Sequence, residues 1–295
     1  MLRAIKRLVL EEFLKNLIKN GYSDNTVDNI KGVLTKAIRY AYLHDMVEGS
    51  CDSVISRLDI KVNSVHIRDN KHSTQQKNVY ISKEDIEKLL TRFPEGNQAH
   101  IPIMLAYHLG LRAGEAYGVR WKNIDFKKKT IYIEGQVTYN ESIKEWVYYP
   151  PKNDSFRIIN MDDELCDLLL REKARQDLNK KNKKYVNVLI DKNKVINYFE
   201  GEKADFVVQF KYGGFVGSNA RQNIANVAHK ELNIPFTFHS LRHTHCSDLA
   251  AKGVDVIYLY KRMGHKSIKT TLKYYTHDTD EMLENNFEHL NSIFE

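Results

Sequence analysis

The chain has 295 residues, 42% of them hydrophobic, which is enough for two packed domains. Lys and Arg number 45 against 38 Asp and Glu, so the formal charge is +7 and the pI near 9.0, a balance that favours polyanionic partners. No apolar run approaches about 18 residues, which argues against a membrane-spanning helix and a signal peptide.

The N-terminal part, residues 1–62, is predicted to form a helical domain. Apolar residues recur at a spacing near 3.6 on both sides of the turn "NGYSDNT" (20–26), which indicates two amphipathic helices. Ser23 or Asp24 is placed to cap the second helix. The following residues, 63–79, are polar and show no sustained period, so they predict an interdomain linker.

A second domain is predicted from residue 80. In "YISKEDIEKLL", Ser82 and Asp85 indicate a capping box with Asp in place of the usual Glu. "TIYIEGQV" (130–137) and "EWVYYP" (145–150) alternate as the strands of a hairpin, and "FRIINM" (156–161) adds a third strand. Helical patterns precede and follow these strands. The predicted fold class is therefore mainly α with a small antiparallel β-sheet, in two domains.

Four stretches of this second domain contain side chains suited to phosphodiester chemistry. Guanidinium groups match phosphate oxygens with paired N–H donors and stay charged, and histidines can complete such a cradle. A tyrosine in line with the phosphorus can act as nucleophile, while a lysine on a hairpin can protonate the departing oxygen. The stretches are "GLRAGEAYGVRW" with Arg112, "YYPPKNDSFR" with Lys152, "FHSLRHTH" with His239 and Arg242, and "MGHKSIKTTLKYYTH" with His265 and Tyr275.

The spacing within these stretches is consistent with one shared site. His239 and Arg242 are three residues apart on a predicted helix, so they project from the same face. Glu115 follows Arg112 by three residues and can hold its guanidinium. Gly264 allows a tight turn before the next imidazole.

In this order and at these separations, the motifs resemble those of the tyrosine recombinases, the integrases of phages and conjugative transposons. The resemblance covers residues 80–277 and implies a catalytic domain there, within a two-domain DNA clamp. It implies a type IB topoisomerase-like mechanism without metal or other cofactor, a 3′-phosphotyrosyl intermediate and strand exchange through a Holliday junction. The expected partners are double-stranded DNA, further copies of the chain (dimer to tetramer on DNA) and accessory DNA-bending or excision factors.

The family's roles carry over residue by residue. They fall on the phosphate-clamping arginines Arg112 and Arg242, the hairpin lysine Lys152, the two histidine positions His239 and His265, and the acidic residue Glu115. The family's nucleophile commonly stands directly before Thr-His or Ser-His, which selects Tyr275. Successive helical residues point about 100° apart, so Tyr274 is expected to pack or to contact backbone.

Two parts of the chain depart from the family pattern or leave alternatives open. Asn153 replaces the Thr usual after the lysine, which leaves the hydrogen bonding around Lys152 open. Residues 21–49 resemble the later half of a core-binding domain, and the earlier half and any arm-type domain are expected to be shortened or absent, either because the chain is truncated or because its clamp is reduced. The tail 278–295 has apolar residues at helical spacing; it is expected either to pack on its own domain or to dock on a neighbouring protomer.

Other functions are less well supported. A metal ion among the histidines would have to lie beside Arg242, without carboxylates or thiolates to offset the repulsion. The three cysteines are odd in number and widely spaced, so free thiols in a reducing cytoplasm are expected. The resemblance implies that this compartment is the bacterial cytoplasm or nucleoid. Two alternatives remain for the function: a Xer-like dimer resolvase, and a DNA-binding relative without activity.

Overall fold

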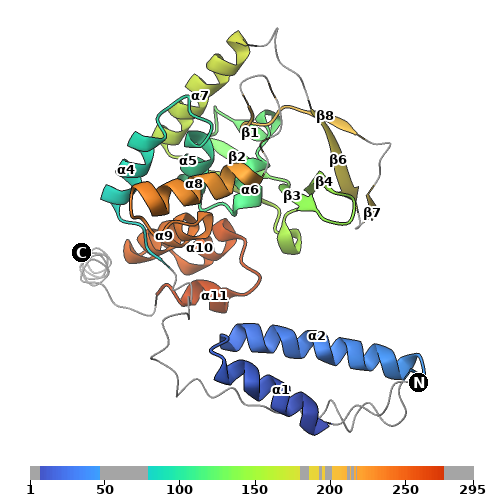
Figure 1. Ribbon diagram of the computed structural model, residues 1–295. Helices are drawn as coiled ribbons and strands as arrows, with labels where there is room; N and C mark the ends of the chain where they lie inside the picture. Colours follow the sequence, from blue (N-terminus) through green and yellow to red (C-terminus); the bar gives the residue numbers. More distant parts are fainter. Residues whose placement is uncertain are drawn as a thin grey trace. The chain divides into compact units, whose positions relative to one another are not determined.

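The computed structural model describes residues 7–46, 79–179, 186–192, 195–196, 201–210, 213, 216 and 218–275. The chain divides into two compact units, Met1–Lys77 and Asn78–Glu295 (Figure 1). Most of the predicted linker and the whole C-terminal segment 278–295 lie outside the described residues. No helix in the described ranges combines the length and apolarity needed to cross a membrane.

Within residues 7–46, the first unit has two helices, α1 (Arg7–Lys19) and α2 (Asp24–Leu43). The turn between them uses Gly21 with a positive φ of 80°. Ser23 is the N-cap of α2, and its hydroxyl accepts a hydrogen bond from the Thr26 amide. Leu14 and Val27 are buried where the two apolar faces meet. The helical prediction holds here, and the cap is Ser23 because Asp24 already lies within the helix.

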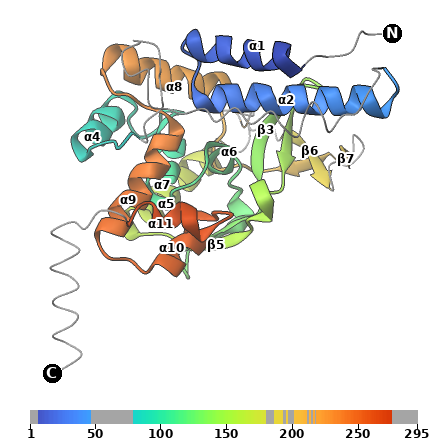
Figure 2. The same ribbon diagram turned by 90° about the horizontal axis from the view of Figure 1, so that it is seen from below.

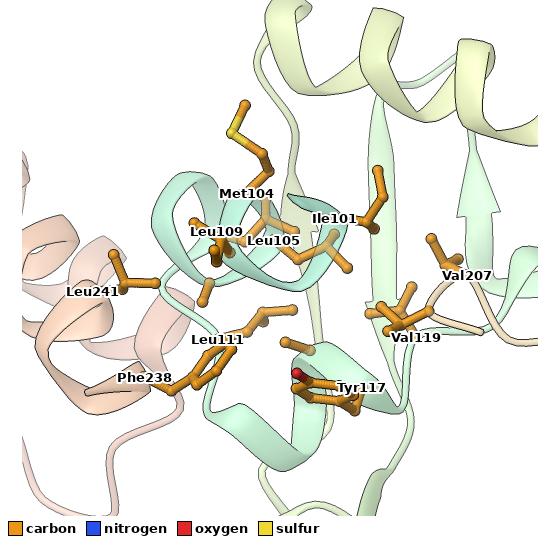
Figure 3. Packing of buried hydrophobic residues seen from close by; sticks show 14 of the residues in the cluster. Ile101, Met104, Leu105, Leu109, Leu111, Tyr117, Val119, Val207, Phe238 and Leu241 are labelled. Carbon is orange, nitrogen blue, oxygen red and sulfur yellow. The ribbon is translucent and has the colours of Figure 1, made fainter. Parts of the chain in front are cut away.

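The described part of the second unit consists of helices and two small sheets. Its core surrounds α5, which is apolar on nearly every side and packs against α6, α7 and α9. Figure 3 shows Leu105 and Leu109 of α5 close to Leu241 of α9. The helices are α4 (Lys83–Arg92), α5 (His100–Leu109), α6 (Ala113–Tyr117), α7 (Asp163–Leu178), α8 (Ser218–Glu231), α9 (Phe238–Ala251), α10 (Val256–Met263) and α11 (Ile268–Leu272).

The described strands form two small sheets. This confirms the predicted fold class, but the strands predicted to share one sheet belong to two. One sheet is antiparallel, in the order β1 (Ile124–Asp125), β2 (Thr130–Ile133), β5 (Arg157–Asn160). The other has the order β3-β4-β6-β7, with β8 paired to β6 and a parallel contact between β4 and β6. Its strands are β3 (Gln136–Asn140), β4 (Glu145–Tyr149), β6 (Val186–Lys192), β7 (Val195–Ile196) and β8 (Glu202–Ala204).

The prediction that 130–137 is one hairpin strand is therefore wrong. The predicted strand is interrupted between β2 and β3. β2 pairs with β5, and β3 pairs with β4. Gly135 lies at this break against the buried ring of Tyr148: a Cβ at Gly135 would stand 2.3 Å from the ring carbon Cζ. Alternating apolarity continues through the break, so the pattern alone did not indicate it. Figure 2 shows where β5, in the first sheet, lies beside α10.

Replacing Gly135 with Ala is expected to lower the free energy of unfolding by about 1–3 kcal/mol, because the added methyl group overlaps the Tyr148 ring. Denaturant titration of both proteins measures the change. The matched control is Gly201→Ala, where the added Cβ meets Asn187 at an ordinary 3.4 Å. Equal stability of the Gly135 variant and the wild type would contradict the close approach.

Candidate active site

The site is built around the C-terminal end of α10. The last carbonyls of a helix lack partners within it and carry partial negative charge. Here three consecutive carbonyls, 262–264, each accept a hydrogen bond from an arginine of a different segment. The bonds run from Arg157 Nε to the carbonyl oxygen of Arg262 (2.8 Å), from Arg242 Nη2 to that of Met263, and from Arg112 Nη2 to that of Gly264 (2.7 Å).

Glu115 is a fully buried carboxylate shared by two of these arginines. It accepts from Arg112 Nη1 at 2.7 Å and from the Arg112 amide at 3.0 Å, and from Arg157 Nη2 at 2.8 Å. Burial alone would raise the pKa of Glu115. The hydrogen bonds and charge of Arg157, then the charges of Arg112 and Arg242, lower it to about 2. Glu115 is thus a buried negative charge among three positive ones.

Arg242 is 2% exposed and is fixed by two helix ends. Besides its bond at α10, its Nη1 donates to the carbonyl oxygen of Gly110 at 2.6 Å, at the end of α5. Gly110 has a φ of 63°, and a Cβ there would lie 2.6 Å from His245 Cδ2. Burial and the nearby charge of Arg112 lower the pKa of Arg242, which remains protonated at neutral pH.

Two histidines flank the arginines. His239 stands one turn before Arg242 on α9, and burial followed by the charges of Arg242 and Arg112 lowers its pKa. His265 follows Gly264, and its Nδ1 lies 2.8 Å from the buried Thr271 hydroxyl. Burial and the same arginines lower the pKa of His265 to about 4. Both rings are neutral at pH 7, so they can donate hydrogen bonds without adding positive charge.

Lys152 lies on the turn between β4 and β5. Asn153 and Asp154, which follow it, have positive φ values of 60° and 51°. The Ser155 hydroxyl donates to the Lys152 carbonyl at 2.9 Å and lies 3.4 Å from Nη1 of Arg112. The Lys152 side chain is exposed and forms no ion pair within the described part of the chain. The turn therefore contacts Arg112 through the Ser155 hydroxyl, while the ammonium of Lys152 faces solvent.

The two tyrosines occupy different surroundings. The Tyr274 ring lies 4.8 Å from the ring of His243 and 6.4 Å from that of His265, nearly parallel to the latter. The Tyr275 hydroxyl donates to the carbonyl of Val254. Burial, followed by Cys246, raises the pKa of both tyrosines to about 12. The structure thus gathers the two arginines, the two histidines and Glu115, whereas the Lys152 ammonium faces solvent and the Tyr275 hydroxyl points to Val254. Tyr274 lies beside His243 and His265.

Two residues important to this geometry were not singled out from the sequence. Arg157 ends the quoted stretch "YYPPKNDSFR", yet its spacing from Arg112 indicates no contact. Arg262 donates to the carbonyls of His108 and Asn160, both at 3.0 Å, and to the His245 ring at 3.1 Å. The described residues contain no group of three or more His, Cys, Asp and Glu placed to hold a metal ion.

Glu115→Gln is expected to lower the free energy of unfolding at pH 7 by about 3–5 kcal/mol, because it removes the buried counter-charge of Arg112 and Arg157. The folded pKa of Glu115, about 2, lies below the ordinary 4.5. Its stabilisation is therefore complete above pH 4.5 and is lost as the pH falls through 2. Denaturant titrations across this range should show a steeper loss for the wild type than for the variant.

The matched control is Glu95→Gln. Glu95 bonds Arg171 at 2.9 Å, but both side chains are about half exposed. An exposed pair contributes at most about 1 kcal/mol. An equal loss of stability in the two variants would contradict the role of Glu115 as a buried counter-charge.

Comparison with known proteins identifies relatives along the whole chain. A model of the phage integrase family matches residues 79–282. The chain is 24% identical to a protein named tyrosine recombinase XerC-like from Caldanaerobacter subterraneus subsp. tengcongensis, over 98% of this chain and 72% of that protein. It is 25% identical to the integrase of Staphylococcus phage L54a (96% and 78%) and 27% identical to the transposase of transposon Tn916 from Enterococcus faecalis (94% and 64%).

Solved structures share the fold. The Tn1549 transposon integrase in complex with a circular intermediate DNA has a TM-score of 0.69 at 24% identity, covering 97% of this chain and 85% of that one. A lambda integrase dimer bound to a core site has a TM-score of 0.55 at 15% identity, covering 94% and 81%. The family match spans more than half of the chain. The chain therefore belongs to the phage integrase family, the tyrosine recombinases, which cleave and rejoin DNA strands.

Proposed function

We propose that this protein is a site-specific DNA recombinase that integrates and excises a mobile element, such as a phage or a conjugative transposon. One observation carries the proposal: Arg112 and Arg242, 130 positions apart in sequence, donate to the adjacent carbonyls of Gly264 and Met263. Two guanidiniums are thus fixed side by side, as the clamping of one phosphate requires. The relatives named as integrases and transposases support the same function.

The arginines and histidines stabilise the transition state in this proposal. Attack on a phosphodiester adds negative charge to the non-bridging oxygens, which Arg112 and Arg242 offset. Neutral His239 and His265 donate further hydrogen bonds. Removing one such preorganised donor typically costs about 3–4 kcal/mol in the barrier. The buried Glu115 keeps Arg112 oriented without lying in contact with the phosphate.

Tyr275 is the proposed nucleophile and Lys152 the proposed acid. The Tyr275 oxygen bonds to phosphorus, the bond from phosphorus to the 5′ oxygen breaks, and Lys152 protonates that oxygen. The pKa of Tyr275, about 12, keeps this side chain neutral at pH 7, so the phenolic proton passes to a water molecule as the oxygen attacks. Cleavage requires the hydroxyl to leave the Val254 carbonyl. Rejoining reverses these steps.

The remaining assignments concern domains and partners. Residues 1–62 form a core DNA-binding domain, 63–79 the linker, 80–277 the catalytic domain, and 278–295 a segment that packs in place or docks on a neighbouring protomer. The partners are double-stranded DNA, two to four copies of the chain on that DNA, and accessory bending or excision factors. The charge of +7 favours such DNA contacts, and the bacterial cytoplasm is the proposed compartment.

A nicked suicide DNA substrate tests the nucleophile. Tyr275→Phe is expected to bind this DNA as the wild type does and to form no covalent adduct stable to SDS. Tyr274→Phe is the matched control and should retain the adduct, because its ring packs without supplying the attacking oxygen. Peptide mapping of the wild-type adduct identifies the residue directly. An adduct on Tyr274, the tyrosine beside His265, would reverse the assignment.

Arg112→Ala is expected to lower the cleavage rate by about 100- to 1,000-fold, since it removes charge stabilisation of the transition state. DNA affinity, measured by band shift at fixed salt, should change far less. A thermal melt verifies that the variant is folded, because Arg112 also bonds Glu115. Equal losses of rate and affinity would indicate a binding role only.

The same assays separate the alternatives. A DNA-binding relative without activity would shift the substrate without forming an adduct. A dimer resolvase would form the adduct but recombine two copies of a single site, whereas an integrase joins two different sites.

A further inference from the structure

Arg157 is almost enclosed and almost fully bonded. Its side chain is 7% exposed. Of its five N–H groups, four point to acceptors in three separate segments. The bonds run from Nε to the Arg262 carbonyl (2.8 Å), from Nη1 to Glu115 Oε1 (3.2 Å) and the Ser155 carbonyl (3.1 Å), and from Nη2 to Glu115 Oε2 (2.8 Å).

This geometry rules out direct phosphate binding as the main task of Arg157. A phosphate clamp needs N–H groups that remain available for the substrate. Arg157 directs four of its five N–H groups to protein acceptors, whereas the more deeply buried Arg242 directs only two of its five to carbonyls within the described residues. The contacts of Arg157 instead connect three parts of the site: the carboxylate that holds Arg112, the end of α10 just before His265, and the turn that carries Lys152.

Loss of Arg157 would disturb the Lys152 turn more than it would disturb Arg112 and Arg242. Arg112 keeps its bonds to Glu115 and Gly264 without Arg157, and Arg242 keeps its two carbonyls. The turn contains two non-glycine residues with positive φ, a conformation that persists only where the surroundings hold it. The Asp154 amide closes the turn by donating to the Pro151 carbonyl at 3.0 Å, and Arg157 bonds the Ser155 carbonyl directly after these two residues. The 3.4 Å contact of the Ser155 hydroxyl with Arg112 is longer than the bond that Arg157 makes.

We propose that Arg157 is a positioning residue that fixes the Lys152 turn against Glu115 and the end of α10, so that the ammonium reaches the departing 5′ oxygen. The inference rests on the proposed function. A lysine cannot replace Arg157 here, because a single ammonium cannot present the planar fork that reaches three segments at once. Loss of Arg157 then impairs proton donation while the phosphate clamp persists.

The leaving group makes this testable. In normal DNA the bond from phosphorus to the 5′ oxygen breaks, and that oxygen needs the Lys152 proton. With sulfur in the bridging 5′ position, the bond to sulfur breaks and a thiolate departs without protonation, because a thiol is much the stronger acid. Sulfur therefore rescues a variant that has lost only proton donation. It does not rescue one that has lost charge stabilisation of the non-bridging oxygens.

Single-turnover cleavage of both nicked substrates by the full chain is the experiment. Arg157→Lys is expected to cleave normal DNA about 10- to 100-fold more slowly, as a misplaced catalytic group would, and to cleave the sulfur substrate within about 3-fold of the wild type. Lys152→Ala should follow the same pattern. Arg112→Lys should stay slow on both substrates. DNA affinity should remain unchanged in Arg157→Lys.

The matched control is Arg175→Lys. Arg175 also forms a two-point pair with a buried carboxylate, Glu172, at 2.8 and 2.6 Å on α7, and it makes no bond to the site residues. Its cleavage of both substrates should equal that of the wild type. If Arg157→Lys melts below the assay temperature, Arg157→Gln, which keeps two N–H donors, is measured at lower temperature with the same substrates.

Two results would overturn the proposal. Slow cleavage of both substrates by Arg157→Lys would show that Arg157 acts through the phosphate clamp, and normal cleavage of both would show that it has no part in the reaction. Failure of the proposed function looks different: the wild type itself would form no adduct, or sulfur would not rescue Lys152→Ala.

Discussion

The site depends on the end of α10, where three successive carbonyls bind three arginines. Three guanidiniums held this close repel one another, and the buried position strengthens that repulsion. The partial negative charge of the helix end and the ionised Glu115 offset it. The cluster retains excess positive charge, because one carboxylate faces three guanidiniums. This excess positive charge can attract and bind a negatively charged phosphate group.

The site also requires the backbone at two helix ends to lie close to neighbouring elements. Gly110 and Gly264 both end helices with positive φ, and both lie where a Cβ would meet a site element. At Gly264 the nearest atoms are Cβ of Ser155 at 3.0 Å and Nη1 of Arg157 at 3.1 Å. The same glycine that turns the chain toward His265 thus lets α10 pack against the Lys152 turn.

The tyrosines belong to a separate, smaller part of the core. Tyr274 and Tyr275 pack against a cluster of four buried residues that is distinct from the main cluster around α5. Small satellite clusters contribute fewer apolar contacts, so rearranging them costs less than disturbing the main core. This cluster is nevertheless joined to the arginines, because it contains Met263, whose carbonyl accepts the hydrogen bond from Arg242.

The sequence by itself determined the mainly helical class, the Ser82 cap and the family, because local periodicity, capping chemistry and ordered motifs lie in short stretches. It left the cap of the second helix open between Ser23 and Asp24, and the structure has Ser23. The sequence also placed Glu115 within reach of Arg112, three residues away on one turn. Only the tertiary structure decided that 130–137 divides between two sheets and that Arg157 joins the cluster. It likewise decided that the Tyr275 hydroxyl bonds Val254. These features come from contacts between distant segments, whose geometry depends on how whole elements pack and not on spacing along the chain.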